Sequence, residues 1–213
     1  MSNLFERILD SQYRKPAGWL GAWIGGRMAR DHRPENLWTV QALHAQPKDQ
    51  ILEIGFGAGV AIQELAKIAR EGCISGIDFS RTMLAAAARR NAAAVRAGKV
   101  KLYFGEAGEL PFHAETFDKA FSIHSIYFWP DPAGALREIR RVLKPGGLLA
   151  LTILPRELWN TGQPDKAVGT PECRPYAGSE LEGMLREAGF RSTRIEADTD
   201  PRLRSNFTVI GER

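Results

Sequence analysis

The stretch Ile51-Leu52-Glu53-Ile54-Gly55-Phe56-Gly57-Ala58-Gly59 decides the fold class of this 213-residue chain. Its first four residues form a short, mostly apolar run, which predicts a buried strand. The glycines that follow let a backbone turn sharply and approach a ligand closely. Between residues 62 and 69, apolar residues recur three and four positions apart, which predicts a helix directly after the turn. The stretch therefore predicts a strand, a glycine-rich turn and a helix in succession.

The same alternation of short apolar runs and helical patterns continues to residue 154, and it favours a parallel sheet. Two further runs near the C-terminus are joined by too few residues for a helix, so we expect them to pair as an antiparallel hairpin. The sequence thus predicts an α/β fold with a mostly parallel, seven-stranded sheet. The expected strands cover residues 51–54, 73–77, 100–104, 120–124, 148–154, 194–197 and 206–210. One Ala-rich helix is expected over 83–97, and a long loop over 156–176.

Composition indicates a soluble, cytoplasmic protein without metal. Hydrophobic residues make up 44% and charged residues 25% of the chain, as in ordinary globular domains. No apolar run approaches the roughly 18 residues that a membrane span needs, and the N-terminus does not resemble a secretory signal. The two cysteines suggest neither a disulfide framework nor a metal cluster. The net charge of +4 is spread over scattered Lys and Arg residues, so no nucleic-acid partner is expected.

Residues 1–46 precede the predicted fold and are expected to form a helical cap or lid on a domain that spans 47–213. An apolar stripe includes Trp19, Trp23 and Met28, but four nearby glycines weaken the helix. A weak amphipathic segment suits a lid that orders over a ligand. An ordinary packed helix is an equal alternative. A third reading is peripheral attachment to a membrane surface through the tryptophans and neighbouring arginines.

The spacing of the glycines separates two classes of ligand. Dinucleotide-binding folds use G-x-G-x-x-G, whereas glycines here occupy positions 55, 57 and 59, and position 60 is Val. Glu53 adds a carboxylate at the end of the strand, and a carboxylate would repel a pyrophosphate while attracting a cation. The turn therefore favours a cationic ligand over a dinucleotide.

At this motif the sequence resembles the class I S-adenosylmethionine (SAM)-dependent methyltransferases, and the resemblance covers residues 50–154 and the C-terminal hairpin. It implies a Rossmann-like, doubly wound sheet and SAM as the methyl donor. Residues 76–84 resemble the second motif of the family, in which an acidic residue, here Asp78, holds the ribose hydroxyls. Two carboxylate oxygens facing a vicinal diol can form a bidentate hydrogen bond. The resemblance assigns to the cofactor Glu53, Gly55, Gly57, Gly59, Asp78, Phe79 and Met83.

Residues 105–112 resemble the family segment that follows the third strand, where an acidic residue accepts from the adenine amino group. The family usually has Asp where this chain has Glu106. The longer side chain keeps the acceptor but changes its reach, so the backbone at Ala107 is the alternative contact.

His124 is the informative departure from the family, because it ends the fourth expected strand where close relatives carry Asn. This edge of the sheet normally faces the methyl group. A histidine there could act as a general base or orient the acceptor, or it could simply line the cofactor pocket. Tyr127 and Trp129 could form the wall of a substrate site or fill the core.

These observations predict a methyltransferase that acts on a small-molecule acceptor. A lipid or quinone acceptor at a membrane surface is one alternative, and a non-catalytic SAM-binding protein is another. Nucleic-acid methylation is disfavoured because the chain has no Pro-Pro motif after the fourth strand and no appended recognition domain. The acceptor and the oligomeric state stay open at this point.

Overall fold

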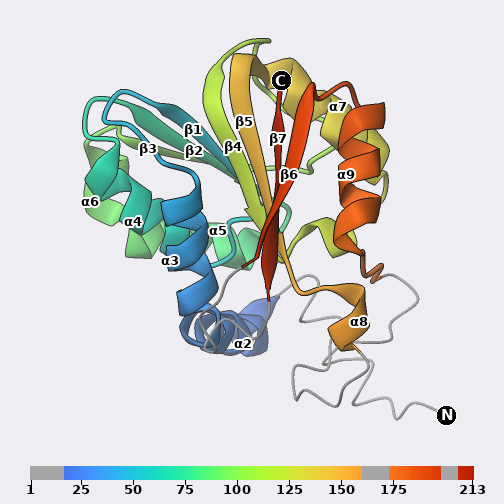
Figure 1. Cartoon of the computed structure of the whole chain (residues 1–213). Coiled ribbons are helices and arrows are strands. Elements are labelled where there is room, and N and C mark those ends of the chain that lie inside the picture. The colour runs from blue at the N-terminus through green and yellow to red at the C-terminus, as the bar shows by residue number, and fades with distance from the viewer. Residues whose placement is uncertain (1–16, 160–172, 198–205) are drawn as a thin grey trace, which may run out of the picture.

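The computed structural model describes residues 17–159, 173–197 and 206–213 and arranges them around one mixed sheet (Figure 1). The sheet has seven strands in the order β3-β2-β1-β4-β5-β7-β6. The pairs among β3, β2, β1, β4 and β5 are parallel, whereas β7 is antiparallel to both β5 and β6. The strands are β1 (Gln50–Ile54), β2 (Cys73–Asp78), β3 (Val100–Phe104), β4 (Phe117–Ile123), β5 (Leu143–Ile153), β6 (Ser192–Ala197) and β7 (Phe207–Glu212). The predicted fold class and the C-terminal hairpin are confirmed.

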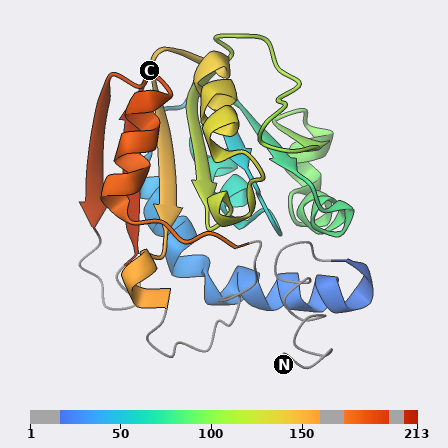
Figure 2. The ribbon, with the colours of Figure 1, turned by 90° about the vertical axis from the view of Figure 1, so that its right-hand side faces the viewer.

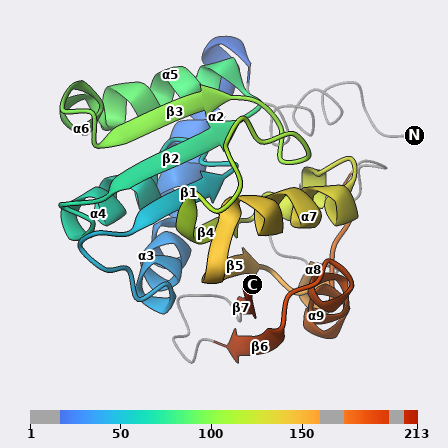
Figure 3. The same cartoon turned by 90° about the horizontal axis from the view of Figure 1, so that it is seen from above.

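Helices cover both faces of the sheet, as Figure 3 shows from above. On one face α3 packs on α4, and α4 and α5 pack on β2; on the other face α7 packs on β5, and α9 packs on β6 and β7. The helices are α2 (Gly18–Asp31), α3 (Arg33–Ala42), α4 (Val60–Ile68), α5 (Arg81–Arg90), α6 (Ala92–Arg96), α7 (Pro132–Val142), α8 (Arg156–Trp159) and α9 (Gly178–Glu187), with a short 3₁₀ turn η1 (Ile126–Phe128).

Alternation along the strands divides the core into two hydrophobic clusters, one on each face of the sheet. Within β1, Ile51 packs with Val40 and Leu65 on the α3 and α4 side, whereas Leu52 joins the opposite cluster. Both side chains are fully buried. A strand buried on both faces explains why β1 reads as a nearly continuous apolar run.

Several elements differ from their predicted limits. β4 begins at Phe117 and not at residue 120, and the helix α8 lies within the segment 156–176 that was predicted to be a loop. The single helix expected over 83–97 is broken at Asn91, whose buried amide donates to the carbonyls of Ala87 and Gly59. The helix is thus interrupted at the residue whose side chain donates a hydrogen bond to the glycine turn. The strand expected from residue 148 begins at Leu143. Gly146, with a φ of +75°, lies in this added part, where the pairing with β4 shifts register.

The N-terminal part of the described chain lies against the end of the sheet. Figure 2 shows α2 running across the ends at which β4 and β5 point. α3 follows it and contributes buried Thr39 and Val40 to the core, as does Leu43 directly after it, so α3 is packed against the sheet. Residues 1–16 of the predicted cap lie outside the described residues. None of the helices in the described ranges has both the length and the apolar character that crossing a bilayer requires.

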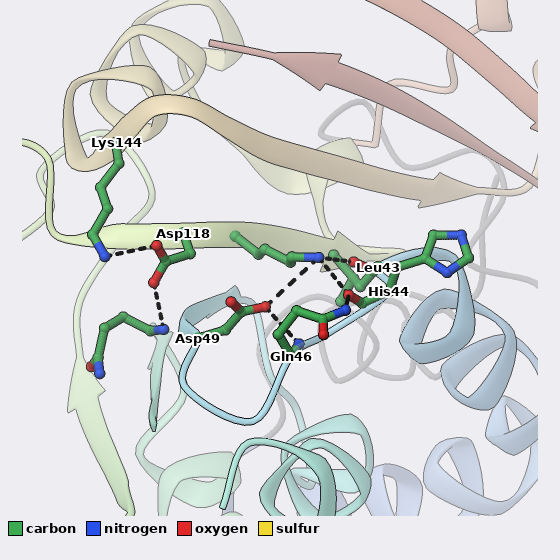
Figure 4. Close-up of polar contacts among 8 residues, drawn as sticks. Leu43, His44, Gln46, Asp49, Asp118 and Lys144 are labelled. Atoms are coloured by element: carbon green, nitrogen blue, oxygen red, sulfur yellow. Dashed lines mark hydrogen bonds and ion pairs between the residues drawn. The ribbon is translucent and has the colours of Figure 1, made fainter. Parts of the chain in front are cut away.

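A polar cluster joins the connection between α3 and β1 to β4 (Figure 4). The ammonium of Lys119 donates to the carbonyls of Leu43 and His44 and lies 3.7 Å from a carboxylate oxygen of Asp49. Beside it, Asp118 accepts from Lys144 and from the N–H of Gln50 at 2.7 and 2.8 Å. Burial lowers the pKa of Lys119, and the Asp49 carboxylate opposes that shift. The cluster therefore fastens the N-terminal layer to the sheet.

Replacing Lys119 with Met is expected to destabilise the protein by about 1–3 kcal/mol, because two carbonyls and a carboxylate lose their donor. For a chain of this size the melting temperature should fall by roughly 2–12 °C. Thermal unfolding followed by circular dichroism measures the change. Lys99→Met is the matched control, because Lys99 donates to a single exposed carbonyl, that of Arg70. Equal melting temperatures for the two variants would contradict the anchoring role of Lys119.

Candidate functional site

The glycine turn after β1 forms the floor of the main cavity. Gly55 and Gly57 have φ values of +75° and +50°, a conformation that side chains other than glycine rarely adopt. The N–H of Gly55 donates to the carbonyl of Ile77 at 2.8 Å, which ties the turn to β2. The cavity also meets α2 and the end of β4, so the turn lies where three parts of the chain converge.

The cavity, about 140 Å³ in volume, brings together most of the residues predicted for the cofactor. Its lining includes the predicted residues Glu53, Gly55, Gly57, Asp78, Phe79, Met83 and His124. Gly59 is not among them. It begins α4 with a φ of +73°, and a Cβ there would lie 2.7 Å from the Asn91 amide and 2.9 Å from Ala87. Gly59 therefore permits close packing of the turn against α5.

Asp78, at the end of β2, is positioned by two backbone donors. One carboxylate oxygen accepts from the N–H of Gly57 at 2.9 Å, and the other accepts from the N–H of Ser80 at 2.8 Å. Burial raises the pKa of Asp78 to about 6, although these two hydrogen bonds oppose the shift. The carboxylate thus lies between the glycine turn and α5 with its charge only partly compensated.

Glu53 brings a second carboxylate to the same wall. It is 2% exposed, and its Oε2 has no hydrogen-bond partner within the described part of the chain. Burial raises the pKa of Glu53 well above its usual range, and the charge of Asp78 raises it further, while the N–H of Ile62 opposes both. Two buried carboxylates beside one cavity create a site that a cation would stabilise.

The unfolding free energy of the ligand-free protein should depend on pH through the ionisation of Asp78. Its pKa is about 6 in the folded state and 3.8 as an isolated group, so folding takes up a proton between these values. The resulting stability is fully present below pH 3.8 and is lost as the pH rises through 6. From pH 7.5 to 5, this group alone should add about 1 kcal/mol to the unfolding free energy.

Denaturant unfolding at several pH values, compared between wild type and Asp78→Asn, measures this contribution. The comparison is needed because other carboxyls respond in the opposite sense. Burial would raise the pKa of Asp118, but hydrogen bonds from Lys144 and Gln50 outweigh it and hold that pKa low. Identical pH dependence in wild type and variant would contradict the assigned state of Asp78.

Helix α2 supplies a wall of the cavity that motif reasoning did not identify. Gly25, Met28, Ala29 and His32 line it. At Gly25 a Cβ would lie 2.5 Å from the Met83 side chain, so this small residue lets α2 approach α5 closely. The glycines that weaken α2 as an isolated helix thus include one that the packing requires.

Two polar side chains in the first turn of α3, Arg33 and Asn36, lie near this wall. Asn36 lines the cavity. Arg33 instead lies 3.6 Å from Glu64 and is not among the lining residues. Of these two neighbours, Asn36 is therefore the one placed to meet a ligand.

A second cavity adjoins the first on the other side of Asp78 and Phe79. It is lined by Glu106, Ala107 and Trp129 among others, so it holds the segment predicted to contact adenine. Glu106 is exposed and Ala107 is buried. Phe128 lines both cavities and was not singled out from the sequence. The two cavities together follow the carboxyl ends of β1, β2 and β3.

His124 directly follows β4 and has a φ of +52°, unusual for a residue with a side chain. Its Nδ1 lies 3.3 Å from the hydroxyl of Tyr127. That hydroxyl donates its one proton to the carbonyl of Leu154 at 3.2 Å and accepts from the N–H of Leu154 at 2.6 Å. A His124 tautomer that donates from Nδ1 to this hydroxyl carries its lone pair on Nε2.

Tyr127 and Trp129, which were predicted to line a substrate site or fill the core, have different surroundings in the structure. Tyr127 is buried, and its hydroxyl is engaged by Leu154 and His124, so it positions the histidine. Trp129 donates from Nε1 to Ser125 at 3.2 Å and lines the second cavity. Both also line a third hollow with Arg174 and Tyr176. The main cavity therefore includes neither side chain.

Known proteins resemble this chain in sequence and in fold. Residues 52–151 match a sequence family described as a methyltransferase domain. An uncharacterized methyltransferase of Bacillus subtilis, YdaC, is 34% identical over 169 residues, which cover 79% of this chain and 86% of that protein. The O-methyltransferase resE of Aspergillus sclerotiorum is 33% identical over 70% of this chain and 57% of its own length. The chain thus spans little more than half of that fungal relative.

Among solved structures, a protein of Thermotoga maritima superposes on this one with a TM-score of 0.68. The superposition covers 98% of this chain and 97% of the Thermotoga chain. The Thermotoga protein is described as a SAM-dependent methyltransferase and possible histamine N-methyltransferase. At 24% identity, the likeness shows a shared fold.

Proposed function

The chain belongs to the SAM-dependent methyltransferases, and on that premise we propose that it transfers the methyl group of SAM to a small-molecule acceptor bound in the main cavity. The observation that carries the proposal is the pair of buried carboxylates, Glu53 and Asp78, on either side of the left-handed glycine turn. Burial raises the pKa of both carboxyls, so a bound cation, such as a sulfonium compound with an ammonium group, would stabilise their ionised forms.

The donor, when bound, supplies a methyl group already activated by a positively charged sulfur. Asp78 would hold the ribose hydroxyls, and Glu53 would face the cationic end of the molecule. The second cavity, with Glu106 and Ala107, would take the adenine. The methyl acceptor loses one proton as the new bond to carbon forms, and S-adenosylhomocysteine (SAH) is the other product.

The chain contributes to the rate mainly by alignment and by exclusion of water. Met28 and Ala29 from α2 and Phe128 from the 3₁₀ turn line the cavity, so its walls are largely apolar around the reacting atoms. His124 marks the acceptor side, at the end of β4. A small acceptor with an apolar body and one nucleophilic atom fits this lining.

The test is SAH release from SAM over a panel of small acceptors, run beside a measurement of SAH affinity. Because a fungal relative is an O-methyltransferase, the panel begins with phenols and alcohols and continues with amines and thiols. We expect micromolar SAH binding and turnover with at least one acceptor class. Tight SAH binding without turnover on any class would overturn catalysis and support the non-catalytic alternative.

One observation favours an acceptor at a membrane surface. Trp23 on α2 is 59% exposed, and Arg27 lies one turn away with its side chain 60% exposed. An exposed tryptophan beside a cation is the pattern of an interfacial helix. Flotation with anionic vesicles decides between the candidates: binding that is lost in Trp23→Ala would support a lipid or quinone acceptor. The small-molecule proposal expects no flotation.

A further inference from the structure

Three side chains from two distant parts of the sequence meet at one wall of the main cavity. His32 lies at the junction of α2 and α3, Glu35 is in the first turn of α3, and His124 follows β4. One nitrogen or oxygen from each lies within 4.8 Å of the others. The ring centroids of the two histidines are 4.9 Å apart, and Nδ1 of His32 is 3.8 Å from Oε1 of Glu35.

Glu35 is a buried carboxylate with few hydrogen bonds, and its burial needs an explanation. It is 1% exposed, and only one of its carboxylate oxygens accepts a hydrogen bond within the described residues, from the amide of Asn206 at 3.4 Å. Oε2 of Glu35 and Nδ1 of His32 are buried without a hydrogen-bond partner in the same residues. Such groups cost folding free energy unless something pairs with them.

We propose that His32, Glu35 and His124 bind one divalent transition cation such as Zn²⁺. Two imidazoles and one carboxylate, with a position left open, form the ligand set of catalytic zinc and of non-haem iron sites. Ligand atoms about 2.1 Å from a tetrahedral metal lie roughly 3.4 Å from one another, so atoms up to 4.8 Å apart must approach by up to about 1.4 Å when the metal binds.

The surroundings of the cluster resemble the support that metal ligands receive elsewhere. Nδ1 of His124 lies 3.3 Å from the Tyr127 hydroxyl, and the tautomer that donates from Nδ1 would present the lone pair of Nε2 as the ligand atom. The amide of Asn206 holds Oε1 of Glu35. The hydroxyl of Thr39, one turn along α3, donates to the Glu35 carbonyl at 2.8 Å, so the helix is held at this point.

The open position of the metal would face the main cavity. His32 and His124 line the cavity, whereas Glu35 does not, so the carboxylate lies behind the two imidazoles. If the chain methylates an acceptor in that cavity, as proposed above, the metal would bind the oxygen or sulfur of the acceptor and make its proton more acidic. The metal site itself rests on the three side chains alone and does not depend on that function.

The experiment is a titration of the chelator-treated, tag-free protein with Co²⁺ and then Zn²⁺, without SAM or acceptor. We expect one Co²⁺ per chain with visible d–d absorption, displaced by Zn²⁺, and a dissociation constant in the micromolar range or below. Glu35→Gln and His32→Ala should each weaken binding at least 100-fold. His113→Ala is the matched control, because His113 is exposed and outside the cluster, and it should bind as wild type does.

The absence of a d–d spectrum in wild type would overturn the metal site, and so would unchanged affinity in Glu35→Gln and His32→Ala. If Glu35→Gln does not fold, His32→Ala decides alone, because His32 is only partly buried. Failure of SAH binding with normal Co²⁺ binding would count against the proposed function and leave the metal site standing. The sequence-based expectation of no metal would then be wrong.

Discussion

Replacing Asp78 with Asn is expected to weaken the binding of SAH by roughly 10- to 150-fold, the effect of about 1.5–3 kcal/mol for a lost charge-assisted hydrogen bond. The carboxylate of Asp78 is oriented by the N–H groups of Gly57 and Ser80, so it faces the cavity in one position before a ligand arrives. An amide cannot accept with both atoms, and one of its ends would oppose a backbone donor. Isothermal titration with SAH at pH 7.5, where Asp78 is ionised, measures the change.

Asp131→Asn is the control for this variant. Asp131 also accepts from a backbone N–H, that of Gly134 at 2.9 Å, but it caps α7 and is not among the residues that line the two cavities of the proposed cofactor site. Its replacement should leave SAH affinity within a factor of two. An Asp78→Asn protein that folds and binds SAH as tightly as wild type would remove Asp78 from the cofactor site.

Replacing Gly55 with Ala is expected to have the largest effect on stability. The residue has a φ of +75°, which costs an alanine about 1–2 kcal/mol. Its Cβ would also lie 2.5 Å from Cβ and Oγ of Ser125, and overpacking of this kind costs about 1–3 kcal/mol. Ser125 has little freedom to move, because it donates to the carbonyl of Ile54 and accepts from Trp129.

Together these costs predict a fall in melting temperature of roughly 5–15 °C for Gly55→Ala. Gly146→Ala is the matched control, since Gly146 also has a φ of +75° but no atom within 4 Å of the added Cβ. The difference between the two variants isolates the collision with Ser125. Equal melting temperatures would show that the turn and the end of β4 are not packed as described.

The parts of the fold that could be predicted from the sequence are those that local patterns encode. The run at 51–54 and the glycines after it indicate β1 and its turn. A strand buried on both faces requires apolar residues, and a left-handed backbone favours glycine. The break at Asn91 could not be predicted in this way. It depends on a hydrogen bond to Gly59, which is 32 residues away.

The residues of the candidate site likewise include some that local sequence predicts and some that only tertiary packing places there. Glu53 and Asp78 end their strands, so the alignment of parallel strands brings them to one edge, as expected from the sequence. His32 and Met28 reach that edge only because α2 crosses the ends of the strands, and this depends on the contact of Gly25 with Met83. One local signal was available: His32 and Glu35 are three residues apart at a helix start, a spacing at which two ligands share a face.

The central claim is that SAM binds along the carboxyl ends of β1, β2 and β3, between the glycine turn and α2. A crystal structure of the protein with SAH tests it most directly. We expect both ribose hydroxyls within hydrogen-bond distance of Asp78, the adenine beside Ala107, and the sulfur facing the side of the cavity where His124 lies. A ribose with no contact to Asp78, or SAH bound outside these two cavities, would contradict it.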